Sequence, residues 1–118
     1  MKKFSVLLLA LGVLSSFSIH AGGYSSKATP TGIEIDRDNG IMVFGAFGNP
    51  AGCTQSDRFY VAKTHPQYDK VYAMLLAAYA AKKKIGFYGH DCIPVLWYSN
   101  NSVTYNQLIS GGSISISD

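Results

Sequence analysis

The chain carries little net charge once its first residues are set aside. It has 118 residues, with ten Lys and Arg against seven Asp and Glu. Lys2 and Lys3 are two of those basic residues, so the part after residue 21 has a formal charge of only +1. A nucleic-acid-binding domain needs clustered positive charge to displace the counterions of phosphate groups. The composition therefore disfavours that class, and we expect no nucleic-acid partner.

The chain also lacks a second long apolar run. The first run, from Phe4 to Phe17, follows Lys2-Lys3 and precedes Ser18-Ile19-His20-Ala21. This order is typical of the basic, apolar and cleavage regions of a signal peptide, which we place at residues 1–21. No later stretch approaches the roughly 20 apolar residues that span a bilayer, so we expect no membrane span. The sequence predicts a secreted or periplasmic protein.

The length is too short for a second domain, and no internal repeat is visible. Residues 22–32 are rich in Gly, Ser, Thr and Pro and have little to bury, which favours a flexible N-terminus of the mature chain. We therefore expect a signal peptide at 1–21, a flexible segment at 22–32 and a single domain at 33–118.

Cysteine is scarce, and Cys53 and Cys92 are the only two. An exported chain meets an oxidising compartment, so we predict that they form a disulfide. Closing a loop of about 40 residues contributes on the order of 4 kcal/mol in the chain-entropy account. The alternative is a hydrolase built on Cys92 and His90, but catalytic pairs are assembled across a fold rather than from near neighbours on a strand.

Metal and catalytic motifs are missing as well. His65, His90 and Asp91 have no recognised ligand spacing, so we interpret the histidines as surface or capping residues and expect no metal. No pair of titratable residues stands out with a catalytic motif. We therefore predict a protein that is not an enzyme and that needs no cofactor.

A β-hairpin is the clearest local feature. Residues 33–37 read Ile-Glu-Ile-Asp-Arg and alternate apolar and charged up to Asp36, residues 41–47 are apolar, and Asn39-Gly40 between them is a strong turn signal. A two-residue turn would place one set of side chains on the core face: Ile33, Ile35, Met42 and Phe44. The acidic row opposite has the period of a solvated strand face, which we prefer to paired catalytic carboxylates: Glu34, Asp36 and Asp38.

The rest of the chain predicts one helix among short strands. Apolar residues recur at helical spacing over about 66–82: Tyr68, Val71, Tyr72, Leu75, Leu76 and Tyr79. Thr64 and Gln67 fit a capping box at the start of that helix. Strands are expected at 58–63, 85–89, 93–98, 103–105 and 113–117. This order predicts an α+β or mainly β fold, a small OB-like, partly open barrel of five or six strands.

Several of these segments carry a resemblance. The stretch Cys53-Thr54-Gln55-Ser56-Asp57-Arg58-Phe59, the Ala-rich helix ending at Lys84, the strand Ile85-Gly86-Phe87-Tyr88 and then Cys92 resemble a group of small exported bacterial proteins of unknown function. The same order is similar to the binding subunits of subtilase-cytotoxin-type AB5 toxins. That resemblance implies an OB barrel, a homopentameric ring and a cell-surface glycan as ligand. No ligand-contacting residue transfers from it.

The aromatic residues near the C-terminus are the candidate ligand site. Trp97 and Tyr98 offer apolar ring faces to sugar C–H groups, and Asn100 and Asn101 add polar partners beside them. We therefore expect a non-enzymatic, glycan-binding module with these residues as its ligand site. Two alternatives stay open: an inhibitor that inserts the loop 47–55 into a hydrolase, and a structural role in the cell envelope.

Overall fold

The computed structural model describes residues 22–98 and 100–118, so the predicted signal peptide lies outside the described residues. One helix and eight short strands follow in chain order: β1 (Gly23–Tyr24), β2 (Gly32–Ile35), β3 (Ile41–Phe44), β4 (Arg58–Val61), α1 (Tyr68–Ala81), β5 (Lys84–Gly89), β6 (Asp91–Ile93), β7 (Tyr105–Gln107) and β8 (Ile114–Ser117). The helix was expected at 66–82, and the strands are more numerous than the five or six expected.

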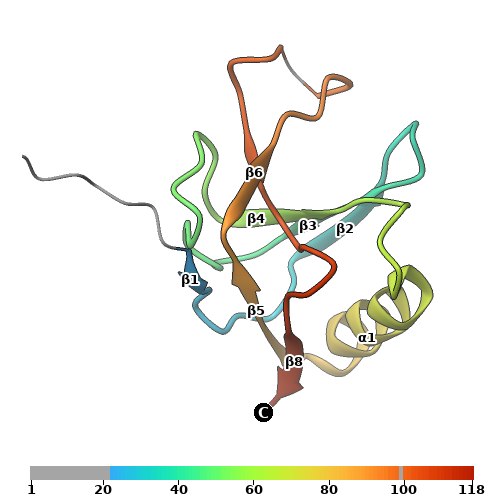
Figure 1. Cartoon of the computed structure of the whole chain (residues 1–118). Helices are drawn as coiled ribbons and strands as arrows, with labels where there is room; N and C mark the ends of the chain where they lie inside the picture. The colour runs from blue at the N-terminus through green and yellow to red at the C-terminus, as the bar shows by residue number, and fades with distance from the viewer. Residues whose placement is uncertain (1–21, 99) are drawn as a thin grey trace, which may run out of the picture.

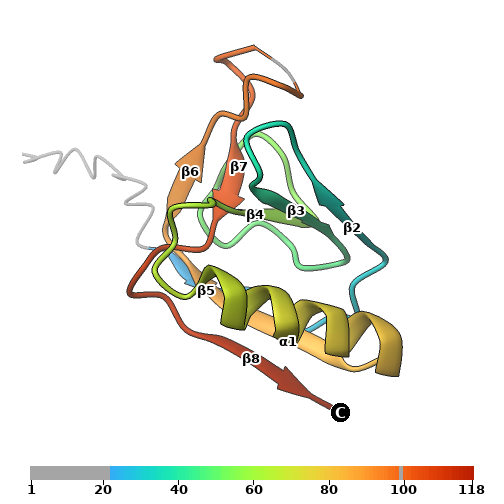
Figure 2. The same ribbon diagram turned by 90° about the vertical axis from the view of Figure 1, so that its right-hand side faces the viewer.

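The strands form two sheets, and α1 packs beside them (Figures 1 and 2). The larger sheet has the order β2-β3-β4-β7-β6 and the smaller one β1-β5-β8. Every strand pair is antiparallel except β4 with β7. The prediction of a mainly β fold with one helix is confirmed. The described strands do not close into a barrel.

The hairpin lies where the sequence predicts it, but its register is different. Ile35 pairs with Ile41 and Glu34 with Met42, so the connection is the five-residue loop 36–40. The expected two-residue turn would have put Glu34 opposite Gly45. The shift is an odd number of residues, so it reverses the face of every β3 side chain relative to β2. The predicted core face of β2 with Met42 and Phe44 is therefore wrong.

Both faces of β3 are buried, each in a different cluster. Ile41 and Val43 lie in the larger core with residues from α1 and β5, and Ile33 packs against it. Met42 lies in a smaller core with Tyr60, Val95 and Tyr105. A strand that is buried on both faces has a continuous apolar sequence. The sequence pattern alone therefore does not predict which side chain lies in which core.

The segment 22–32, expected to be flexible, is tied to both sheets. Its residues form β1 against β5, and Ala28 exchanges two backbone hydrogen bonds with Ile85. Thr31 donates its backbone N–H to the carbonyl oxygen of Phe44. Small residues have little to bury, but their backbone groups pair as well as any others. Sequence composition did not reveal this pairing.

Helix α1 buries a narrower stripe than predicted. Val71, Leu75 and Ala78 are its buried residues, whereas Leu76 and Tyr79 are exposed. The predicted capping box is absent, because Gln67 makes no side-chain cap. Instead the backbone N–H of Gln67 donates to Nδ1 of His65 at 3.0 Å. His65 therefore stabilises the turn that leads into α1.

Candidate functional site

Trp97 is the most exposed large aromatic ring in the predicted ligand segment. It remains 47% exposed in a turn that follows β6. The guanidinium carbon of Arg37 lies 4.4 Å from the centroid of the Trp97 ring. A cation in this position is attracted to the ring face, by about 0.5–1 kcal/mol at an exposed site. The contact joins the 36–40 loop to the turn that carries Trp97.

Asp36 organises the loop that presents Arg37. Its Oδ1 accepts backbone hydrogen bonds from Asp38 and Gly40, both at 2.9 Å. Its Oδ2 accepts the hydroxyl proton of Tyr60 at 2.6 Å. Asp36 is only 7% exposed, so the expectation that it lies on a solvated face is wrong. Burial, and then the hydrogen bond to Asp36, raise the pKa of Tyr60.

Residue 40 must be glycine because the ring of Tyr60 approaches its backbone closely, not because of its backbone angles. A Cβ at this position would lie 1.8 Å from the Tyr60 hydroxyl oxygen. The left-handed residue of the loop is Asn39, with φ of 63°. The Asn-Gly pair therefore marks the turn, while the carboxylate of Asp36 sets its length by offering the backbone N–H groups an alternative acceptor.

A cleft of about 320 Å³ opens beside this junction. Residues 93–96 form its apolar wall, and Leu96 at its rim is 66% exposed. Asp38, Lys63 and Thr64 provide an acceptor, a cation and a hydroxyl along the other side. An apolar wall opposite a few polar groups is the usual make-up of a small-ligand site. Leu96 precedes Trp97 and Asp38 follows Arg37, so the cleft adjoins the Trp97–Arg37 contact.

The other predicted ligand residues lie in different environments. Tyr98 is half-buried and packs against the smaller core. Its hydroxyl makes no hydrogen bond of ordinary geometry in the described part of the chain. Burial, and then the neighbouring carboxylate of Glu34, raise the pKa of Tyr98. The rings of Trp97 and Tyr98 remain neighbours, with centroids 6.4 Å apart, but Trp97 is exposed whereas Tyr98 packs against the smaller core.

The two asparagines also differ from each other. The side chain of Asn100 accepts hydrogen bonds from the backbone N–H and the hydroxyl of Ser102, which stabilise the local turn. Asn101 is exposed in the same loop. Arg37, Asp38, Lys63 and Thr64 were not predicted as site residues. Their spacing in the sequence carries no motif, because the fold brings them together from separate loops.

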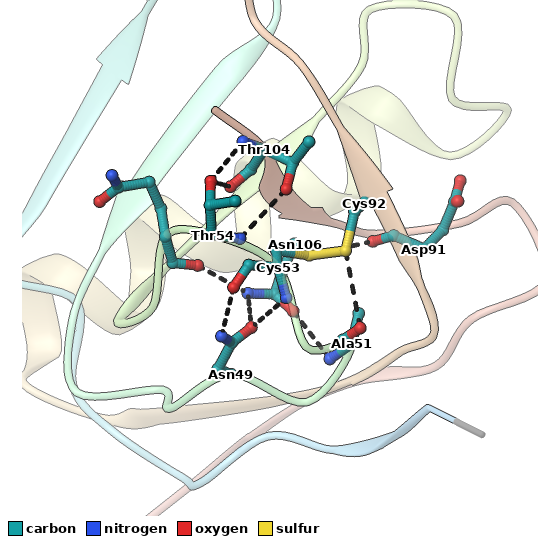
Figure 3. The surroundings of a disulfide bond; sticks show 9 residues. Asn49, Ala51, Cys53, Thr54, Asp91, Cys92, Thr104 and Asn106 are labelled. Atoms are coloured by element: carbon teal, nitrogen blue, oxygen red, sulfur yellow. Dashed lines mark hydrogen bonds between the residues drawn. A yellow bond between two sulfur atoms is a disulfide. The ribbon is translucent and has the colours of Figure 1, made fainter. Parts of the chain in front are cut away.

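The disulfide between Cys53 and Cys92 is present, with its Cα atoms 5.6 Å apart (Figure 3). It rules out Cys92 as the free thiol of a hydrolase.

The side chain of Asn106 is fully buried and holds the neighbouring loop. It donates to Asn49 and to the carbonyl oxygen of Gln55, and it accepts from the N–H of Ala51. Every backbone N–H from residue 51 to 55 donates to an acceptor within the protein. Hydrogen bonds between Gly48 and Asp57 join the two ends of the loop 48–57, and bonds to Thr104 and Asn106 hold its middle.

Two further clefts, of about 400 and 440 Å³, flank His65. The ring of His65 is nearly buried and uses both nitrogens: Nδ1 accepts from Gln67, and Nε2 lies 3.0 Å from the carbonyl oxygen of Ile109. Those bonds connect α1 to the segment after β7. Within residues 22–98 and 100–118 there is no cluster of metal-ligating side chains, and no helix there is long and apolar enough to cross a membrane.

Comparison with protein-family models, with curated proteins and with solved structures found no match to this chain.

Proposed function

We propose that this protein is an exported, non-enzymatic binding module whose ligand is a glycan. The observation that carries the proposal is the exposed ring of Trp97 beside a cleft that is apolar on one wall and polar on the other. A sugar ring has the matching chemistry, with C–H groups on its faces and hydroxyl groups around its edge. An aromatic ring packs against the C–H groups, while short polar side chains bind the hydroxyls.

The side chains best suited to catalysis are engaged in structural bonds, which supports binding rather than catalysis. Asp36 accepts three hydrogen bonds that shape its own loop. His65 uses both ring nitrogens to join α1 to a neighbouring segment, and Cys53 and Cys92 share a disulfide. These four side chains, of Asp36, His65, Cys53 and Cys92, thus stabilise the fold. Asp38 and Lys63, by contrast, are exposed beside the cleft.

The inhibitor alternative is less well supported. A loop that lies in a protease cleft as an extended strand uses its own backbone N–H and C=O groups to bind the enzyme. The N–H groups of residues 51–55 are all engaged within the protein. The loop 47–55 would have to break these bonds before it could pair with an enzyme in that way.

The proposed site of action is outside the cytoplasm. A structural disulfide persists in oxidising compartments, so the Cys53–Cys92 bond fits an extracellular or periplasmic protein. The resemblance to toxin subunits, taken alone, implies a homo-oligomer in which five copies of the mature chain form a ring of about 50 kDa. Sedimentation of the mature protein tests that expectation.

A glycan array followed by calorimetric titration of the best ligand tests the proposed function. We expect Trp97→Ala to weaken binding at least tenfold while the melting temperature stays near the wild-type value. The matched control is Tyr79→Ala, because Tyr79 is 46% exposed, on the outer side of α1. Equal loss of binding in both variants, or no binding to any glycan, would refute the proposal.

Substitutions in the cleft sharpen this test. Asp38→Asn removes a charge but keeps an acceptor, and Lys63→Ala removes the cation; both residues are exposed. If the cleft receives the sugar hydroxyls, each change should weaken binding several-fold. If Trp97 alone is responsible, both variants will bind like the wild type.

A further inference from the structure

Strand β8 forms an open edge of the smaller sheet (Figure 2). Ile85 of β5 bonds to Ala28 on the opposite side, whereas the N–H of Tyr88 donates to the carbonyl oxygen of Ser113. Bonding directions alternate along a strand, so Ser115 and Ser117 face β5. The backbone N–H and C=O groups of Ile114 and Ile116 therefore point outward, and no strand of the described chain pairs with them.

This edge differs from the other three sheet edges of the described chain. β1 is two residues long, β2 carries Glu34, and β6 begins at Asp91 and is followed by Pro94. Short length, charge and proline are the usual means by which proteins prevent an edge from pairing. Residues 113–117, Ser-Ile-Ser-Ile-Ser, have none of them, and Ile116 is 39% exposed.

We propose that a second copy of this chain binds here, pairing its β8 antiparallel with this one across a two-fold axis at Ser115. In that register Ile114 of each copy lies opposite Ile116 of the other, and both exchange backbone hydrogen bonds. Isoleucine then neighbours isoleucine and serine neighbours serine, so no like charges meet. Asp118 stays at the outer ends, beside Lys83 of its own chain. The contact is self-complementary, as a two-fold interface requires.

The size of the contact sets its strength. One short strand from each copy buries much less than the roughly 800 Å² per partner of a stable complex. We therefore expect a dimer that forms with increasing protein concentration. Such a dimer of the mature chain has a mass of about 20 kDa and closes with two copies. Sedimentation velocity over a concentration series distinguishes it both from a monomer and from the homopentamer expected from the resemblance.

Cysteine cross-linking tests the register. The two Ser115 residues would form a non-hydrogen-bonded pair with Cα atoms about 4.5 Å apart, within the range of a disulfide. Oxidised Ser115→Cys protein should therefore run as a covalent dimer on a non-reducing gel. Ser113→Cys is the matched control: residue 113 would lie opposite residue 117 of the second copy, so the new thiols stay apart. Random exchange with Cys53–Cys92 would affect both variants equally.

A second variant tests the backbone pairing. Ile116→Pro removes an N–H that points away from β5, a position where an edge strand tolerates proline. We expect it to fold and to remain monomeric at concentrations where the wild type dimerises. Ile116→Lys serves if the proline variant does not fold, because a charge on the edge opposes pairing. A wild type that is monomeric throughout, a pentamer, or equal cross-linking at 113 and 115 would overturn the proposal. Glycan binding is measured separately in dilute protein, so either proposal can fail without the other.

Discussion

The loops 36–40 and 48–57 are both held in place by side chains, but they leave different groups exposed. In the first, Asp36 turns inward to Tyr60 and to the loop backbone, while Arg37 and Asp38 face solvent beside Trp97 and the cleft. In the second, a disulfide and the buried amide of Asn106 engage the backbone from within (Figure 3). A rigid loop can therefore offer side chains to a ligand only if the residues that stabilise it are different from those it exposes.

Removing the disulfide, which holds only the second loop, should have the largest effect on stability. The crosslink joins residues 39 apart, and its loss in the Cys53→Ser, Cys92→Ser double variant should lower the free energy of unfolding by about 4 kcal/mol. Denaturant melts measure the change. Ligand binding by the folded fraction should be unaltered, because Trp97 is held by the other loop. A loss below 1 kcal/mol would contradict the chain-entropy account.

Asn106→Ala should be the next most costly change. It leaves the buried N–H of Ala51 without its acceptor and removes the donor to Asn49 and to the carbonyl oxygen of Gln55, at a cost of about 3 kcal/mol. The same melts apply, with exposed Asn101→Ala as the matched control. If both variants lose equal stability, the network around Asn106 contributes nothing specific.

Asp36→Ala should destabilise less but should disturb the candidate site. The N–H of Asp38 is only part-buried and can bond to water, but the N–H of Gly40 and the hydroxyl of Tyr60 lose a buried acceptor, so we expect a loss of about 2 kcal/mol. Because Trp97 is the only tryptophan, its emission spectrum reports directly on the Arg37 contact. We expect altered emission and weaker ligand binding in folded protein. Unchanged emission would show that Asp36 does not position the loop.

Alkaline pH should weaken the same junction. The pKa of Tyr60 is raised in the folded protein by burial and by its hydrogen bond to Asp36, so the folded state retains a proton that the unfolded state releases. Stability from this group is complete below about pH 10, the unfolded pKa, and is lost as the pH rises further. Melts of Tyr60→Phe should show a shallower decline above pH 10. Parallel curves for the two proteins would argue against this linkage.

Arg37→Gln should have the smallest effect on stability. The cation over Trp97 contributes about 0.5–1 kcal/mol, so the melting curve should hardly move. The fluorescence of Trp97 and its quenching by acrylamide should nevertheless change, because one ring face becomes accessible. Lys63→Gln, the loss of a neighbouring cation, is the control and should leave the quenching as it is in the wild type.

The hairpin shows how far local signals extend. Asn39-Gly40 correctly located the connection between β2 and β3, because turn propensity is a property of a few adjacent residues. The register depended on Asp36, whose carboxylate is buried only because Tyr60, from another strand, approaches it at 2.6 Å. An alternating acidic residue looks the same in sequence whether it faces water or a tyrosine.

The region around Trp97 gives the same lesson for the site. The β-rich composition of residues 93–98 suggested a strand, but Pro94 follows β6 directly and the chain then turns, with the N–H of Tyr98 bonded to Val95. The turn exposes Trp97 and turns Tyr98 toward the smaller core. Composition drew attention to this segment, but it did not distinguish the ring that is exposed from the one that packs.

The amino-acid order alone was sufficient for the helix, the positions of most strands, the turn at Asn39-Gly40 and the pairing of Cys53 with Cys92. The helix, the strands and the turn follow from periodicity and turn chemistry, which depend on residues close in sequence. The disulfide follows because two cysteines in an oxidising compartment have only one possible pairing. Tertiary structure decided the register of β2 with β3, the burial of Asp36 and the approach of Arg37 to Trp97. Each of these depends on residues distant in sequence, whose contacts exist only after the two sheets have packed.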